Sequence, residues 1–169
     1  MAICIEPGMA FGTGQHATTM LCVQALEELD AKGVKPDTLL DVGTGTGILA
    51  IAAHKLGYRS VTATDIDPDS IMAAEANARV NGTPLRVELG TLPSEGAPFQ
   101  VVLANIIFYV LRRIIPDLAG QAASGGFVVL SGILAEEARD MEALALPCGL
   151  KLEHEATQND WACQIYRKV

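Results

Sequence analysis

Residues 39 to 47 read Leu-Leu-Asp-Val-Gly-Thr-Gly-Thr-Gly, and the next strand-like run ends in Asp65. A strand, a glycine-rich turn, a helix, a second strand and an acid follow in the order that a nucleoside-binding crevice needs. Gly43, Gly45 and Gly47 let the backbone turn tightly and approach a ligand closely. Asp65 stands about 20 residues after Gly43, where a carboxylate accepts bonds from both ribose hydroxyls. The G-x-G-x-G spacing differs from the G-x-G-x-x-G dinucleotide fingerprint, which disfavours NAD.

The composition is that of a folded globular protein. The chain has 169 residues, half of them hydrophobic and 19% charged, which suits one domain with a sizeable core. No apolar run approaches the ~18–20 residues that cross a bilayer, and no signal peptide is evident, so we expect no membrane contact and a cytoplasmic location. The net charge of −8 disfavours general binding of nucleic acid and favours a basic protein partner.

The cysteines and histidines do not have the spacing of a metal site. No C-x-x-C pair is present, and the chain has only three histidines. We therefore expect no metal, and we expect free thiols that are buried or partly buried in a reducing compartment. These thiols belong to Cys4, Cys22, Cys148 and Cys163.

Strand and helix patterns alternate along the chain. A loop rich in Gly and Thr is expected at 6–19, and Thr18 or a neighbour can cap the helix after it. Helices are expected at 18–30, 48–56, 68–81, 111–119 and 134–144. Strands are expected at 38–42, 61–64, 85–89, 101–104, 127–130, 150–155 and 161–166, the last two joined through 157–160.

This alternation predicts an α/β fold. We expect a doubly wound, mostly parallel seven-stranded sheet with helices on both faces and a C-terminal antiparallel hairpin. In such sheets the ligand crevice lies outside the carboxyl ends of the strands, near the switch in strand order. Gly43, Asp65 and Asn105 all fall at such strand ends.

With these residues placed, the chain resembles class I S-adenosylmethionine-dependent methyltransferases, and more narrowly the ribosomal protein L11 methyltransferase family. The resemblance runs over nearly the whole chain and implies a Rossmann-like class I methyltransferase fold. Its most specific parts are the Pro-Gly-Met-Ala-Phe-Gly-Thr-Gly block and the Ser-Gly-Ile-Leu motif. The segments that carry it are 7–19, 41–49, Asp-Ile-Asp-Pro at 65–68, Ala-Asn-Ile at 104–106 and Leu-Ser-Gly-Ile-Leu at 130–134.

The resemblance implies that S-adenosyl-L-methionine is the cofactor, and it matches four residues to positions that contact this methyl donor. The matched residues are Thr19, Gly43, Asp65 and Asn105. Asp41, Gly45 and Gly47 complete the expected donor-binding set. Thr19 is expected to offer its hydroxyl from a loop, and Asp41 either contacts the donor's amino group or satisfies loop amides. Asn105 is the candidate catalytic residue, because its amide faces the expected methyl-transfer site.

Several positions leave alternatives open. His16 acts either as a base or as a residue that orders its loop. Phe108 and Tyr109 either line a substrate slot or belong to the core. Gly90 and Thr91 stand where related enzymes often carry an acid that contacts the adenine, so no adenine ligand is assigned.

The resemblance implies N-methylation of a lysine or amino group of ribosomal protein L11 or a similar protein. The protein mainly positions the two reactants, and an apolar slot lowers the pKa of the attacking amine, so a strong catalytic base is not required. The alternatives are a methyltransferase acting on RNA or a small molecule, a NAD-dependent oxidoreductase and a non-catalytic donor-binding domain. We expect residues 1–169 to form the methyltransferase domain alone, without the amino-terminal substrate-docking domain that the family usually carries. The oligomeric state is not indicated by the sequence.

Overall fold

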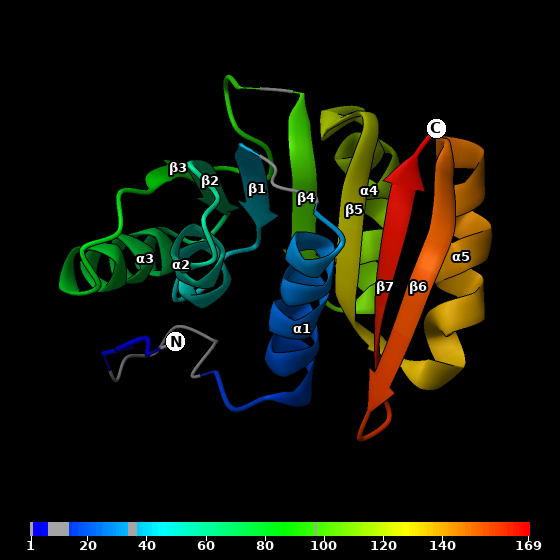
Figure 1. Cartoon of the computed structure of the whole chain (residues 1–169), viewed down its shortest axis with the longest axis horizontal. Helices are drawn as coiled ribbons and strands as arrows, with labels where there is room; N and C mark the ends of the chain where they lie inside the picture. Colours follow the sequence, from blue (N-terminus) through cyan, green and yellow to red (C-terminus); the bar gives the residue numbers. More distant parts are fainter. Residues whose placement is uncertain (1, 7–13, 34–36, 97) are drawn as a thin grey trace.

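The computed structural model describes residues 2–6, 14–33, 37–96 and 98–169, and a seven-stranded sheet forms its centre (Figure 1). The strand order is β3-β2-β1-β4-β5-β7-β6. The strands are β1 (Thr38–Val42), β2 (Ser60–Asp65), β3 (Arg86–Leu89), β4 (Phe99–Asn105), β5 (Ala122–Leu134), β6 (Leu150–Gln158) and β7 (Trp161–Lys168). The first five strands pair in parallel, and β7 runs antiparallel to both β5 and β6. The predicted fold class is therefore confirmed.

Helices cover both faces of the sheet (Figure 1). They are α1 (Ala17–Ala31), α2 (Ile48–Lys55), α3 (Pro68–Val80), α4 (Phe108–Gln121) and α5 (Ala138–Ala145), with short 3-10 turns η1 (Ala135–Glu137) and η2 (Leu146–Cys148). Two apolar clusters fill the space between helices and sheet. Leu39 packs with α1 and α2, whereas the next residue, Leu40, packs with α4 and α5. Successive strand residues point to opposite faces, so a strand buried on both faces reads as a continuous apolar run.

Strand order reverses between β1 and β4, which creates the crevice position expected in this fold. From β1 the chain proceeds outward through β2 to β3, and from β4 it proceeds the other way to β5. Val42 pairs with both Thr64 and Ala104, so the three carboxyl ends lie at the same edge. Gly43, Asp65 and Asn105 are thereby brought to this edge, as the sequence predicted.

The helix expected at 134–144 begins later than predicted. β5 continues through Leu134, because Ile133 and Leu134 pair with β7. The Glu137 carboxylate then accepts the Leu134 N–H at 2.8 Å, which starts η1 before α5. Pairing with a distant strand therefore overrides the local helical pattern here.

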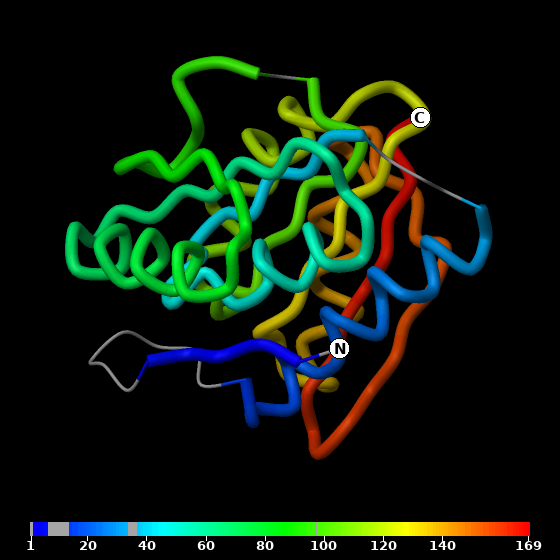
Figure 2. The backbone as a smooth tube through the Cα atoms, turned by 60° about the vertical axis from the view of Figure 1, so that its left-hand side comes forward, coloured from blue at the N-terminus to red at the C-terminus, as the bar shows by residue number. Residues whose placement is uncertain are grey.

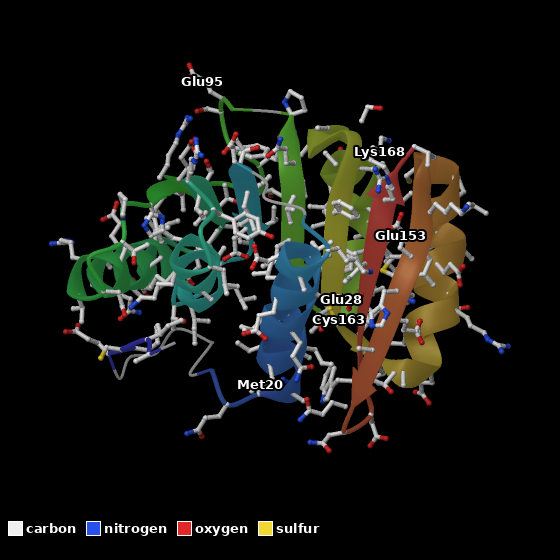
Figure 3. All side chains as sticks on the ribbon, viewed as in Figure 1. Met20, Glu28, Glu95, Glu153, Cys163 and Lys168 are labelled. Carbon is white, nitrogen blue, oxygen red and sulfur yellow. The ribbon has the colours of Figure 1, made fainter. Side chains whose placement is uncertain are left out.

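The C-terminal hairpin is tighter than predicted. Gln158 already pairs with Trp161, so only Asn159 and Asp160 form the connection. Both have positive φ, 49° and 66°, the conformation of a two-residue turn that matches the twist of its strands. The hairpin also contacts α1: the carboxylate of Glu28 (labelled in Figure 3) lies 3.3 Å from His154 Nε2 of β6.

All four cysteines are free thiols. Cys22 and Cys163 are buried and Cys148 is half-buried, but Cys4 is exposed because it lies on a surface segment. Within the described residues, no helix is long and apolar enough to cross a membrane. In the same part of the chain, no three His, Cys, Asp or Glu side chains come together as a metal site would require.

Candidate functional site

The loop after β1 depends on glycine at three positions. Gly43, Gly45 and Gly47 have φ of 72°, 56° and 81°, in the left-handed region that strains other residues. Two of them are also crowded. A Cβ on Gly43 would lie 2.8 Å from Ile106 Cδ1, and one on Gly47 would lie 3.1 Å from the Ala74 backbone. The loop can therefore bring its backbone close to its neighbours only because these side chains are absent.

Asp65 ends β2 and fixes the glycine loop. Its Oδ2 accepts the Gly45 N–H at 2.9 Å, and its Oδ1 accepts the Asp67 N–H at 3.0 Å. The N–H groups of Gly43 and Thr44 both donate to the Thr64 carbonyl, at 2.8 and 3.0 Å. A carboxylate has about four lone-pair sites, so Asp65 still has capacity to accept bonds from a ligand.

Asp41 lies beneath the loop and is only 1% exposed. Its Oδ2 accepts the Thr44 hydroxyl hydrogen bond at 2.6 Å. Burial raises the pKa of Asp41 from 3.8 to about 6 and the nearby charge of Asp65 also raises it, whereas hydrogen bonds from Thr44 and the Ala50 amide lower it. Asp41 is thus bonded to the Thr44 hydroxyl of the loop and to the Ala50 amide of α2, rather than to the loop amides that the sequence suggested. Contact with the donor's amino group remains a prediction.

Asn105 ends β4 on the other side of the switch point, half-buried. Among the described residues its side chain has no hydrogen-bond partner, so its amide remains available to a ligand. The next residue donates from Ile106 N to the Ser131 carbonyl at 3.0 Å. A Cβ on Gly132, which has φ of 83°, would lie 2.6 Å from the Ile106 carbonyl oxygen. Ile106 is therefore held between Gly43 on β1's loop and Gly132 on β5.

Ile106 connects two motifs that are far apart in the chain. The Ile106 side chain touches the glycine loop, and its backbone touches the Ser-Gly-Ile-Leu motif. Sequence reasoning noted both motifs but missed Ile106, since nothing local marks an isoleucine as a contact between three strands. The signal that was available was Gly132 itself, because a glycine inside an apolar strand often marks close backbone approach.

Apolar side chains stand exposed around the same edge. Ile66 follows Asp65 and is 74% exposed, and Leu89, which pairs with Asp65, is 61% exposed. Beyond Asn105, Ile107 is 60% exposed. The Gly90 N–H donates to the backbone carbonyl of Asp65 at 2.8 Å, so the loop after β3 begins beside the end of β2. This edge therefore combines polar groups with open apolar surface, as a small-molecule site does.

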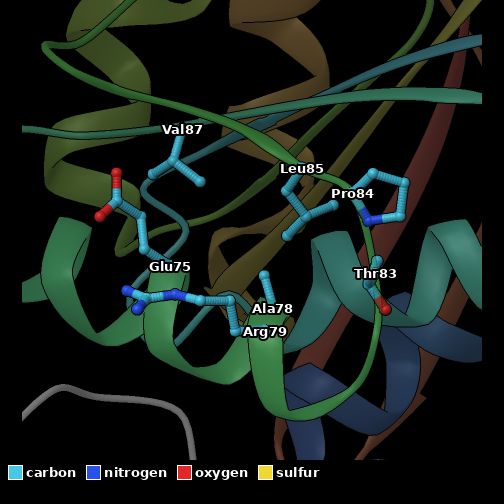
Figure 4. Close-up of a pocket in the computed structure, with 7 residues that line it drawn as sticks. All are labelled: Glu75, Ala78, Arg79, Thr83, Pro84, Leu85 and Val87. Carbon is cyan, nitrogen blue, oxygen red and sulfur yellow. The ribbon is translucent and has the colours of Figure 1, made fainter.

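A surface pocket of about 450 Å³ lies elsewhere, between the second half of α3 and the start of β3 (Figure 4). Glu75 and Arg79 of α3 line it opposite Leu85 and Val87. α3 begins beside the carboxyl end of β2 and runs away from it, so this pocket is separate from the edge that carries Gly43, Asp65 and Asn105.

The chain matches a known protein family over its whole length. The family model described as ribosomal protein L11 methyltransferase (PrmA) matches residues 1–169. The chain belongs to the ribosomal protein L11 methyltransferase family. It is 50% identical over 166 residues to the ribosomal protein L11 methyltransferase of Geobacter sulfurreducens, covering 96% of this chain and 53% of that protein. For the protein of the same name in Geobacter metallireducens the identity is 46% over 169 residues, covering 99% and 54%.

The chain thus spans about half the length of the curated relatives it matches. Among solved structures, the ribosomal protein L11 methylase from Lactobacillus delbrueckii subsp. bulgaricus superposes with a TM-score of 0.87 at 37% identity, covering 98% of this chain and 84% of that one. A methyltransferase from Pyrococcus furiosus superposes with a TM-score of 0.77 at 17% identity, covering 98% and 89%. This second likeness shows the fold alone.

The L11 methyltransferase family's specific block at the start of the chain is only partly visible. Residues 7–13 of the Pro-Gly-Met-Ala-Phe-Gly-Thr-Gly block lie outside the described residues. Gly14, where the description resumes, packs against the first turn of α2, since a Cβ there would lie 2.6 Å from Ile48 Cδ1. The end of this block therefore reaches the glycine loop's own helix.

Thr19 does not lie in a loop, as the sequence suggested, but in the first turn of α1, 3% exposed. The helix starts one residue earlier than expected because its N-cap is His16, a neighbour of Thr18, with Nδ1 accepting the Thr18 N–H at 3.4 Å. The His16 ring also packs edge-on against Trp161, 5.1 Å between centroids. These contacts show His16 ordering its segment, and a donor contact by Thr19 remains a prediction.

The two aromatic residues after Asn105 have different surroundings. Phe108 is half-buried and packs against the core. Tyr109 is 55% exposed, with the Arg113 guanidinium 4.4 Å from its ring centroid and hydrogen-bonded to its hydroxyl. Phe108 is therefore a core residue at the edge of the site, whereas Tyr109 belongs to the surface of α4.

Proposed function

We propose that this chain is an S-adenosyl-L-methionine-dependent N-methyltransferase domain that methylates a protein amine, with ribosomal protein L11 as the first substrate to test. The observation that carries the proposal is the bond between Asp65 and the Gly45 amide. It holds a positive-φ glycine loop and a carboxylate suited to ribose in one arrangement. Family membership points to the same chemistry, and curated relatives bear the L11 methyltransferase name.

The residues at this edge suit each part of the proposed donor. The exposed Gly43 backbone would lie against the methionine moiety, and Asp65 would accept the ribose hydroxyls. Ile66 and Leu89 offer exposed apolar surface beside Asp65 on which a flat base can pack. The negative charge of Asp41, buried under the loop, is favourable for a cationic ligand above it.

The chemistry that remains for the protein is positioning. When bound, the donor supplies a methyl group on a sulfonium, whose sulfur keeps the bonding electrons when the amine nitrogen takes the methyl. Asn105 orients the amine through its side chain or its carbonyl. Exposed Ile107 and half-buried Phe108 make the approach apolar, which favours the neutral amine. The proton that the nitrogen loses passes to water.

A protein acceptor fits the charge of the chain. Its net charge of −8 repels nucleic-acid phosphates and attracts a basic protein, which ribosomal proteins commonly are. A ribosomal substrate would place the reaction in the cytoplasm.

Calorimetric titration and methyl transfer test the proposal together. The chain is titrated with S-adenosylmethionine, then incubated with labelled donor and purified ribosomal protein L11, and mass spectrometry locates the label. We expect donor binding and a methyl group on an amine nitrogen of L11. A chain that binds no donor contradicts the proposal. Binding with label only in RNA or a small molecule of a cell extract contradicts the acceptor, and binding without any transfer identifies a non-catalytic domain.

A further inference from the structure

Asn77 of α3 is a buried polar residue, 2% exposed, whose side chain joins two other segments. Its Nδ2 donates to the Thr46 carbonyl of the glycine loop at 2.8 Å. Its Oδ1 accepts the Glu6 N–H at 2.9 Å. A buried amide that is satisfied at both ends specifies the position of both partners. One side chain therefore fixes the N-terminal segment, residues 2–6, relative to the glycine loop.

Asn81 repeats the arrangement one helical turn further along. Its Oδ1 accepts the Cys4 N–H at 3.0 Å, and its Nδ2 donates to the Cys4 carbonyl at 2.7 Å. Four residues of helix rise about 6 Å, and two residues of extended chain span about 6.6 Å. The spacing of Asn77 and Asn81 therefore matches the spacing of Glu6 and Cys4. The two side chains bond to alternate residues along one edge of the segment, as the backbone of a neighbouring strand does.

The direction of the segment points it at the donor side. The segment runs antiparallel to α3, because Cys4 bonds to Asn81 and Glu6 bonds to Asn77. It therefore runs toward the N-terminal end of α3, which follows Asp65. Figures 1 and 2 both show the segment lying beside α2 and α3. The N-terminal segment thus approaches the glycine loop along α3.

We infer that Asn77 is a positioning residue for donor binding, an inference that rests on the proposed function. Its bond to Thr46 holds the loop residue between Gly45 and Gly47, and so keeps the Gly45 amide directed at Asp65. Its bond to Glu6 ties the N-terminal segment to that same geometry. Asn77 does not touch the donor itself, so its effect passes through the loop.

Asn77→Asp separates the two bonds. The carboxylate keeps an acceptor for the Glu6 amide but turns an oxygen toward the Thr46 carbonyl, so the loop loses its donor. At a temperature where circular dichroism shows the variant folded, we expect its dissociation constant for S-adenosylmethionine to rise roughly tenfold, the scale of one lost buried hydrogen bond. Glu6→Pro removes the other bond by deleting an N–H, and we expect a rise of about threefold from the loss of one part-buried bond.

Two matched variants show whether lost stability alone explains the change. Asn81→Ala removes the outer pair of bonds and the bond from Asn81 Nδ2 to the Asn77 carbonyl, but it leaves the Asn77 side chain and its bond to Thr46 intact. Tyr166→Phe removes the buried hydroxyl bond to Gln164, 2.6 Å, on the distant strand β7. Both should lower Tm while leaving the donor dissociation constant within about twofold of wild type, since neither touches the loop.

The outcomes separate this inference from the proposed function. Wild-type chain that binds no donor refutes both. If the wild-type chain binds the donor and folded Asn77→Asp binds it equally well, only the positioning role is refuted. If Glu6→Pro binds the donor like wild type, the part of the inference that concerns the N-terminal segment is refuted. If Asn81→Ala or Tyr166→Phe weakens binding as much as Asn77→Asp does, general destabilisation is the cause and the inference is overturned. If the Asn77→Asp chain does not fold, Glu6→Pro decides the inference, and unchanged donor binding by Glu6→Pro then overturns it.

Discussion

The two sides of the switch point differ in how completely their polar groups are satisfied. On the donor side, which comprises residues 41–47 and Asp65, Asp41 accepts the Thr44 hydroxyl, Asp65 accepts the Gly45 amide, and two further loop amides donate to the end of β2. On the acceptor side, residues 105–109, the Asn105 amide has no partner among the described residues and Ile107 and Tyr109 are exposed. The donor side is therefore organised by its own hydrogen bonds, whereas the acceptor side is an open surface that its substrate would complete.

The strongest way to break this contrast is to remove the donor side's carboxylate. Asp65→Ala should raise the donor dissociation constant about a hundredfold or more, since charge-assisted hydrogen bonds contribute ~1.5–3 kcal/mol each. Titration calorimetry measures the change. Asp67→Ala is the matched control, because it removes only the cap of α3, in which Asp67 Oδ1 accepts the Asp69 N–H. Normal donor affinity in Asp65→Ala would refute the ribose role.

Buried Asp41 makes the donor side sensitive to pH. With its pKa raised from 3.8 in the unfolded chain to about 6 in the fold, the native state holds a proton that the unfolded state has lost between those values. Stability therefore falls as pH rises from about 4 to about 6, by up to ~3 kcal/mol. Asp41→Asn cannot titrate, so its free energy of unfolding should lack this decline.

Denaturant unfolding of both proteins across the pH range measures the difference directly. The gap between the Asp41→Asn and wild-type curves should change through the window and stay constant above it. Curves that run parallel from pH 4 to 7 would show that Asp41 is not destabilised by burial.

Two glycines in β5 test how tightly the acceptor side is tied to the loop. Gly132→Ala places a Cβ against the Ile106 carbonyl in a left-handed backbone, and should cost about 2–3 kcal/mol of unfolding free energy. Gly125→Ala has similar φ but open space, with its nearest atom 3.9 Å away, and should cost about 1 kcal/mol. Thermal and denaturant unfolding compare them, and equal losses would mean that crowding at Ile106 is not important.

The smallest expected effect tests the candidate catalytic residue. Asn105→Ala should lower turnover about tenfold, which corresponds to the loss of one hydrogen bond that orients the amine. The change in donor affinity should be smaller. Turnover is measured with labelled donor and the best acceptor. If turnover and donor affinity are both unchanged, Asn105 has no role in the site.

The sequence predicts the donor side better than the acceptor side for a physical reason. Glycines with special backbone angles and an acid at a strand end are local signals, so Gly43 and Asp65 could be placed before the fold was seen. Ile106 acts through contacts with β1's loop and β5, and Leu134 joins β5 only because β7 pairs with it. Non-local contacts of this kind leave no local pattern. Thr19 was misplaced for a related reason, since His16 is an unusual cap.

The most direct test of the donor side is an amide chemical-shift titration of the isotope-labelled chain with S-adenosylmethionine. We expect the largest shifts on Gly43, Gly45 and the residues next to Asp65, with smaller shifts at Asn105. We expect no large shifts around Glu75 and Arg79 in the α3–β3 pocket. Saturable shifts centred on that pocket, or none at all, would contradict this placement of the donor.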